Sequence, residues 1–135
     1  MRLVRHLSDL PFQRLVRGSV VTIGAFDGLH HGHEQLLRRV LAESQGRGVP
    51  SVVMSFEPTP REFFSAAAPP ARLMRFREKF DSLADHGIDI FYCPRFSEAM
   101  RSISADAFIR RILVHGLNAR HIVIGDDFRF ARKRE

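Results

Sequence analysis

Four short stretches of the chain consist mainly of apolar and β-branched residues. Runs of this length and composition are typical of strands that are buried on both faces of a sheet, because such strands have no solvent-facing side. We therefore predict strands at residues 19–25, 51–57, 88–93 and 120–126.

The segments between these strands show another pattern, in which apolar residues recur at helical spacing. Residues 33–47 place aliphatic side chains on one face and Arg38 and Arg39 on the other, and Gly46 and Gly48 are expected to end this helix. Two further helices are predicted at 75–87 and 104–116. Their expected core and boundary residues are Phe76, Phe80, Leu83 and Gly87 in the former, and Ser104, Phe108, Ile109, Ile112, Leu113 and Gly116 in the latter.

The alternation of strands and helices predicts an α/β fold, because helices commonly connect parallel strands. The predicted fold class is a doubly wound parallel sheet with strand order 3-2-1-4 and helices on both faces, which gives three α/β/α layers. The exception is the segment 57–74, which contains four prolines and is expected to form a long irregular loop.

The length of 135 residues is expected to give about one domain with its own core. The single cysteine, Cys93, excludes an internal disulfide, and no apolar run reaches the length of a membrane span, so the expected location is the cytoplasm. The net charge of +6 suggests anionic partners. Because the arginines are spread from Arg2 to Arg134, a solvated basic surface is favoured over a nucleic-acid footprint.

Polar, glycine-containing segments follow the first and the fourth predicted strands. In the order 3-2-1-4 these two strands are neighbours where the winding reverses, and ligands bind at the carboxyl ends of the strands at such a point. The first segment, GAFDGLHHGH (24–33), carries His30 and His33 one turn apart at a helix start, where N–H groups and the helix dipole favour a phosphate. We expect the two imidazoles to stabilise negative charge that develops on a phosphorus atom.

Other interpretations of these histidines stay open. The H-x-x-H spacing also suits zinc, but the chain has one distant cysteine and no second paired cluster, so no metal site is predicted. The glycine motifs of a Rossmann dinucleotide site and of a P-loop do not follow the first strand. The histidines could also be ordinary residues of a helix start, and His31 is expected to face solvent.

Four segments of the chain match known signatures in the same order. They are GAFDGLHHGH (24–33), SFEPTPRE (55–62), RFREK (75–79) and IGDDFRF (124–130). The first resembles the ATP-binding signature of the nucleotidylyltransferase superfamily. With the other three, which are similar to an F-x-P-x-P segment, the helix start that follows it and a G-x-D/N-F-x-F motif, the chain resembles the bacterial bifunctional riboflavin kinase/FMN adenylyltransferases, also called FAD synthetases. The resemblance covers essentially the whole chain.

This resemblance implies a domain that joins FMN to the AMP part of ATP, giving FAD and pyrophosphate, with Mg²⁺ carried by ATP. It implies that His30 and His33 are catalytic and contact the phosphates. Of Arg129, Arg132, Lys133 and Arg134, at most one is expected to supply positive charge nearby, because basic residues near a terminus are more often solvated. The implied ATP-binding residues are Gly24, Ala25, Phe26, Asp27, His30, Gly32, His33 and Gly125, of which Asp27 is expected to cap the helix. The implied flavin-binding residues are Phe56, Pro58, Pro60, Asp127 and Phe130.

The sequence departs from the family pattern at Thr59, where many relatives have His, and at Ala131, where they have Gly. The family's second signature, I-S-S-T-x-x-R, and its riboflavin kinase domain are not present up to Glu135. Residues 1–135 are therefore expected to form an adenylyltransferase domain that is incomplete at its C-terminal end, with the kinase domain in cis in the full-length protein. The expected partners are ATP and FMN, without nucleic acid or membrane. The alternatives are a non-catalytic nucleotide- or flavin-binding module and a basic nucleic-acid-binding domain.

Overall fold

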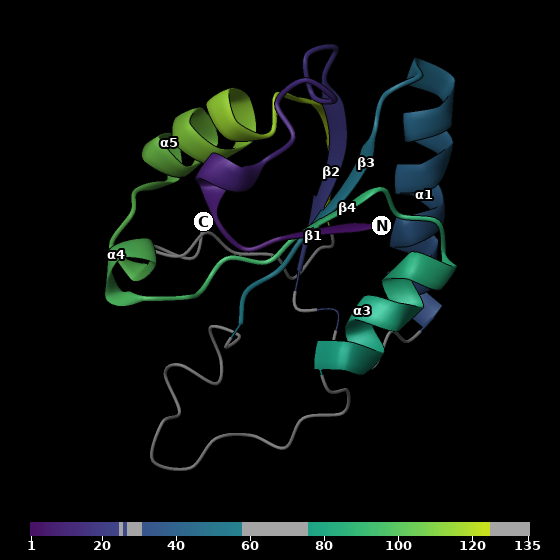
Figure 1. Cartoon of the computed structure of the whole chain (residues 1–135), viewed down its shortest axis with the longest axis horizontal. Helices are drawn as coiled ribbons and strands as arrows, with labels where there is room; N and C mark the ends of the chain where they lie inside the picture. The colour runs from purple at the N-terminus through teal and green to yellow at the C-terminus, as the bar shows by residue number, and fades with distance from the viewer. Residues whose placement is uncertain (25, 27–30, 58–75, 125–135) are drawn as a thin grey trace.

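A sheet of five parallel strands forms the middle layer of the computed structural model (Figure 1). The structure describes residues 1–24, 26, 31–57 and 76–124, with only the backbone of His31 and Gly32. The strand order is β1-β4-β3-β2-β5, and each neighbouring pair is parallel. The strands are β1 (Arg2–Val4), β2 (Ser19–Ile23), β3 (Ser51–Met54), β4 (Ile90–Tyr92) and β5 (Ala119–Val123).

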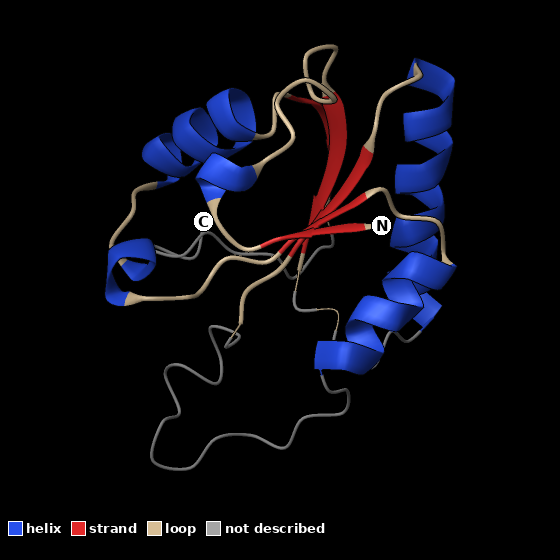
Figure 2. Ribbon diagram, viewed as in Figure 1, coloured by secondary structure: helices blue, strands red, loops and turns tan. Residues whose placement is uncertain are grey.

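Helices cover both faces of this sheet (Figure 2). Helices α1 (His31–Arg47) and α3 (Phe76–Asp85) lie on one face. On the other face lie η1 (Leu7–Asp9), α4 (Glu98–Arg101), α5 (Ala105–Phe108) and the π-helix η2 (Ile109–Gly116), which continues α5 directly. The doubly wound parallel sheet and its three α/β/α layers, as predicted from the sequence, are therefore confirmed.

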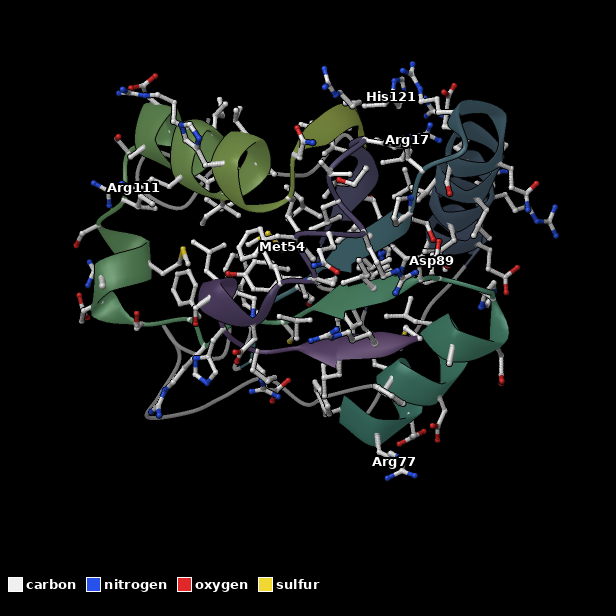
Figure 3. All side chains as sticks on the ribbon, turned by 45° about the horizontal axis from the view of Figure 1, so that its top comes forward. Arg17, Met54, Arg77, Asp89, Arg111 and His121 are labelled. Atoms are coloured by element: carbon white, nitrogen blue, oxygen red, sulfur yellow. The ribbon has the colours of Figure 1, made fainter. Side chains whose placement is uncertain are left out.

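The strands supply side chains to cores on both faces of the sheet. Met54 and Tyr92 pack toward η2, in the same cluster as Ile112, whereas Val53 and Leu37 pack together on the face that α1 covers. Figure 3 shows Met54 in the interior, with the labelled Arg77 and Arg111 on the outer sides of their helices. Burial of apolar surface on both faces explains why the strands read as continuous apolar runs in the sequence.

The predicted strand order is correct for the four predicted strands but incomplete. The order β4-β3-β2-β5 corresponds to the predicted 3-2-1-4, and β1 adds an edge strand that pairs with β4. The sequence analysis missed β1 because it is only three residues long and two of them, Arg2 and Leu3, are exposed, so it forms no apolar run. The short helices η1 and α4 were missed for the same reason of length.

The predicted helix boundaries are largely confirmed, with one difference at the last helix. The Ser104 hydroxyl accepts a hydrogen bond from the Ala107 N–H (3.1 Å), and Gly87 has the positive φ of 91° expected of a C-cap. At the end of η2 the positive φ belongs to Asn118 (49°) rather than to Gly116. Gly116 instead allows close packing, since a Cβ there would lie 2.6 Å from Cδ1 of Leu7.

Candidate active site

The carboxyl ends of the parallel strands lie at one edge of the sheet. Backbone pairing continues past the strand ends, because Gly24 N–H donates to the Met54 carbonyl (3.1 Å) and Ser55 N–H donates to the Tyr92 carbonyl (3.1 Å). Strand β2 lies between β3 and β5, with Thr22 opposite Val123 on the β5 side. The winding reverses at β2, so the predicted location of a ligand site, between the ends of β2 and β5, is present in this fold.

The residue pair Phe26 and His33 joins the end of β2 to the start of α1. Phe26 is only 1% exposed and has a positive φ of 52°, which is unusual for a residue with a side chain. Its ring centroid lies 5.1 Å from that of His33, with 45° between the ring planes. His33 is partly exposed and lies in the first turn of α1. Because this helix begins after the carboxyl end of β2, His33 lies at the carboxyl edge of the sheet.

A second aromatic pair lies on the other side of this edge, after β3 and β4. The rings of Phe56 and Phe96 meet edge to face with centroids 5.4 Å apart. The two loops are held together by a hydrogen bond from Glu57 N–H to the Pro94 carbonyl (3.2 Å). Phe56 was predicted as a site residue and Phe96 was not; the position of Phe96, three residues after the predicted strand 88–93, was the available signal.

Several predicted site residues lie outside the described part of the chain. Of the predicted site residues, the structure describes Gly24, Phe26, His33, Phe56 and the backbone of Gly32, which lies in α1. The residues outside the described ranges are Ala25, Asp27, His30, Pro58, Pro60, Gly125, Asp127 and Phe130, together with Thr59, Arg129, Ala131, Arg132, Lys133 and Arg134.

Helix α1 contributes the partial positive charge of its dipole to this edge, beside the Glu34 carboxyl group in the first turn. The helix has 17 residues, and the dipoles of its peptide units leave partial positive charge at the N-terminal end, where His33 lies. Tyr92 does not contribute an acid or base, because burial in the core raises its pKa to about 12. The groups suited to an anion are therefore the first turn of α1 and the His33 imidazole.

Within residues 1–24, 26, 31–57 and 76–124, no group of three His, Cys, Asp or Glu side chains is arranged to hold a metal ion. No helix in the same part of the chain combines the length and apolar character needed to cross a membrane.

A doubly wound parallel sheet with a histidine at the start of the helix after β2, where the winding reverses, is the arrangement expected of an α/β domain of the nucleotidyltransferase type. The family model described as FAD synthetase matches residues 12–135. The chain belongs to the FAD synthetase family.

The chain is similar in sequence to curated relatives and in fold to a solved structure. The chain is 43% identical over 135 residues to the bifunctional riboflavin kinase/FMN adenylyltransferase of Escherichia coli K12, and 45% identical over 134 residues to that of Pseudomonas fluorescens. It spans 43% and 42% of the lengths of these two relatives. A crystal structure described as a macrolide-efflux protein from Streptococcus pneumoniae superposes with a TM-score of 0.78 at 27% identity, covering 98% of this chain and 43% of that one.

Proposed function

We propose that this chain forms the FMN adenylyltransferase part of its protein, which transfers AMP from ATP to FMN and releases FAD and pyrophosphate. The observation that carries the proposal is the position of His33, which lies in the first turn of α1 at the carboxyl edge of the sheet, where the winding reverses. Membership of the FAD synthetase family and the names of the two relatives support the same activity.

In the proposed reaction, a phosphate oxygen of FMN attacks the α-phosphorus of ATP. The new P–O bond forms as the bond from the α-phosphorus to the bridging oxygen breaks, and pyrophosphate leaves with that oxygen. The attacking phosphate is already ionised, so no general base has to remove a proton. The protein therefore acts by positioning the two substrates and by stabilising the negative charge that builds up on the phosphoryl oxygens.

His33 and the N-terminus of α1 supply this stabilisation from the described part of the chain. An imidazole N–H of His33 donates to a phosphate oxygen, and the N–H groups of the first helical turn face the same anion. His30 is proposed to act beside His33, and Gly24, Ala25, Asp27, Gly32 and Gly125 to line the ATP site. The Phe26 ring is buried, so its contribution to ATP binding is made through the backbone.

The flavin is proposed to bind on the side of β3 and β4. Phe56 is partly buried against the core and leaves an aromatic edge near the ends of these strands. Pro58, Pro60, Asp127 and Phe130 are proposed to complete the flavin site. Aromatic side chains suit the isoalloxazine ring because they offer a flat apolar surface with little loss of conformational entropy.

The remaining features of the whole protein are part of the proposal. Mg²⁺ arrives with ATP and neutralises charge on the phosphates. The relatives are named as bifunctional and this chain spans under half of their length, so we place a riboflavin kinase domain in cis in the full-length protein, in the cytoplasm. Residues 1–135 are then the greater part of an adenylyltransferase domain that the longer protein completes.

The proposal is tested by assaying the full-length protein with ATP, Mg²⁺ and FMN. Chromatography should resolve FAD, and a coupled assay should detect pyrophosphate in equal amount. Titration calorimetry with ATP–Mg²⁺, FMN and a random oligonucleotide supplies the comparison. Binding of ATP and FMN without formation of FAD would favour the non-catalytic binding module. An oligonucleotide that displaces both small ligands would favour the nucleic-acid-binding domain and overturn the proposed activity.

A further inference from the structure

We propose that Phe26 is a positioning residue whose buried ring holds the His33 imidazole in the orientation needed for adenylyl transfer. This inference rests on the proposed function, since it assigns to Phe26 a role that acts through His33. The contact that carries it is the one between the two rings, whose centroids lie 5.1 Å apart at 45°.

The backbone of Phe26 indicates that its position is imposed by the surrounding structure. A φ of 52° is sterically unfavourable for a residue with a Cβ and is usually taken by glycine or asparagine. Such a conformation persists when other contacts hold the residue in place. Here those contacts are in the core, where Phe26 lies in the buried cluster that contains Leu37 and Val53.

Gly24 completes the space that the Phe26 ring occupies. A Cβ on Gly24 would lie 3.1 Å from Cε2 of Phe26, which is closer than about nine in ten contacts of real Cβ atoms. The Phe26 ring therefore lies close to the Gly24 backbone as well as to the His33 imidazole. A side chain at position 24 would require the ring to shift by a few tenths of an ångström.

The role in catalysis follows from the geometry of His33. His33 is partly exposed, and contact with the Phe26 ring restricts the rotamers that its imidazole can adopt. A donor that stabilises charge in the transition state must be aimed before the reaction begins, and a misplacement of about 1 Å can cost about 100-fold in rate. Loss of the Phe26 ring should therefore lower kcat by about 10- to 100-fold and change KM by less than about twofold.

The test compares Phe26→Leu with Phe91→Leu in the full-length protein. Phe91 is a matched control, because it is also buried in the same cluster but stacks on Phe76 at 5.8 Å. Both variants should unfold more easily than the wild type, yet only Phe26→Leu should lower kcat. An equal fall of kcat in the two variants would mean that Phe26 serves the core alone, and the inference would be wrong.

A double-mutant cycle shows whether Phe26 acts through His33. In a His33→Ala background, Phe26→Leu should reduce kcat no further, because the imidazole it orients is gone. Independent, multiplying effects of the two substitutions would overturn the inference. If Phe26→Leu does not fold, Phe26→Met replaces it in the cycle, because the longer, flexible side chain fills more of the buried space while the ring is still removed.

Nuclear magnetic resonance supplies a readout that does not need activity. The His33 ring protons, assigned by their loss in His33→Ala, should carry a ring-current shift that disappears in Phe26→Leu and remains in Phe91→Leu. If the wild-type protein makes no FAD, the proposed function is wrong, and so is the catalytic role of Phe26. The ring-current shift would in that case still show whether the two rings are in contact. Unchanged His33 shifts in Phe26→Leu would overturn the inference even if the wild type is active.

Discussion

Asp89 and Ser51 join the starts of β4 and β3 through reciprocal hydrogen bonds. The Asp89 carboxylate accepts from both the N–H (2.9 Å) and the hydroxyl (3.0 Å) of Ser51, and the Asp89 N–H donates to the Ser51 hydroxyl oxygen (2.9 Å). Both residues lie at the amino edge of the sheet, opposite the edge that carries His33. This arrangement separates a contact that stabilises the fold from the residues proposed to act in catalysis.

We expect Asp89→Ala to lower the free energy of unfolding by about 1–3 kcal/mol, because it leaves the buried polar groups of Ser51 without their acceptor. Urea unfolding measures this change. The control is Asp81→Ala, which removes an exposed ion pair with Arg77 and should cost less than about 0.5 kcal/mol. The kcat and KM of FAD formation should stay the same in folded Asp89→Ala protein, and a selective loss of kcat would contradict the separation of the two edges.

Substitutions at Thr22 and Ser19 are expected to change the free energy of unfolding in opposite directions. Both hydroxyls are buried in β2, but the Ser19 hydroxyl donates to the Leu117 carbonyl (2.6 Å), whereas the Thr22 hydroxyl has no hydrogen-bond partner among the described residues. Thr22→Val should therefore raise the free energy of unfolding by about 1 kcal/mol, and Ser19→Ala should lower it by a similar amount. Destabilisation by Thr22→Val would show that its hydroxyl is paired in solution.

Gly116 and Gly46 are both helical glycines, and we expect alanine to have opposite effects at these positions. At Gly46 a Cβ would meet no atom within 4 Å, so Gly46→Ala should stabilise the protein by about 0.5–1 kcal/mol through helix propensity. At Gly116 a Cβ would lie 2.6 Å from Leu7 and 3.2 Å from the Arg111 carbonyl oxygen, so Gly116→Ala should cost about 1–3 kcal/mol. Thermal unfolding measures both, and stabilisation by Gly116→Ala would contradict the packing described.

Tyr92 makes the stability depend on alkaline pH. Burial raises its pKa from 10.0 to about 12, so the unfolded chain loses the phenolic proton before the native protein does. The contribution of Tyr92 to the free energy of unfolding is fully present below pH 10. It is lost as the pH rises toward about 12, so that the free energy of unfolding falls by about 2–3 kcal/mol in total. Tyr92 is the single tyrosine, so phenolate absorbance follows it directly. Tyr92→Phe should lack this part of the pH dependence, and an ordinary titration near 10 in native protein would show that the ring is solvated.

His33→Ala should reduce FAD formation by about 100- to 1000-fold in kcat, because it removes a donor aimed at charge that develops in the transition state. The matched control is His121→Ala, at the amino edge of the sheet, where His121 Nδ1 lies 3.4 Å from an Arg47 nitrogen. His121→Ala should leave kcat and KM near their wild-type values. Equal activity of the two variants would remove His33 from the catalytic machinery.

The fold could be predicted from the sequence wherever burial leaves a simple pattern. Strands β2 and β3 are buried at every residue, which produces unbroken apolar runs. Strand β1 was missed because an edge strand needs few apolar residues, and the π-helical form of η2 was missed because its apolar residues, such as Ile112 and Leu113, also fit an ordinary α-helix.

The candidate site was predictable in its location but only partly in its contacts. The order of the strands and the glycine-rich segment predict a site at the end of β2, and the structure has β5 beside β2 as expected. The sequence could not indicate that Phe26 takes a positive φ and packs against His33, because that conformation depends on the tertiary contacts of its ring.

The pairing of β1 with β4 has a consequence for synthesis on the ribosome. β1 emerges first, but its neighbour in the sheet is made only after β2, β3 and α3. The nascent chain must therefore close a loop that joins Arg2 to Ile90 before β1 gains its backbone partners. Until then the outer side of β4 is an open edge with which another strand can pair, so this edge is closed only when β1 docks.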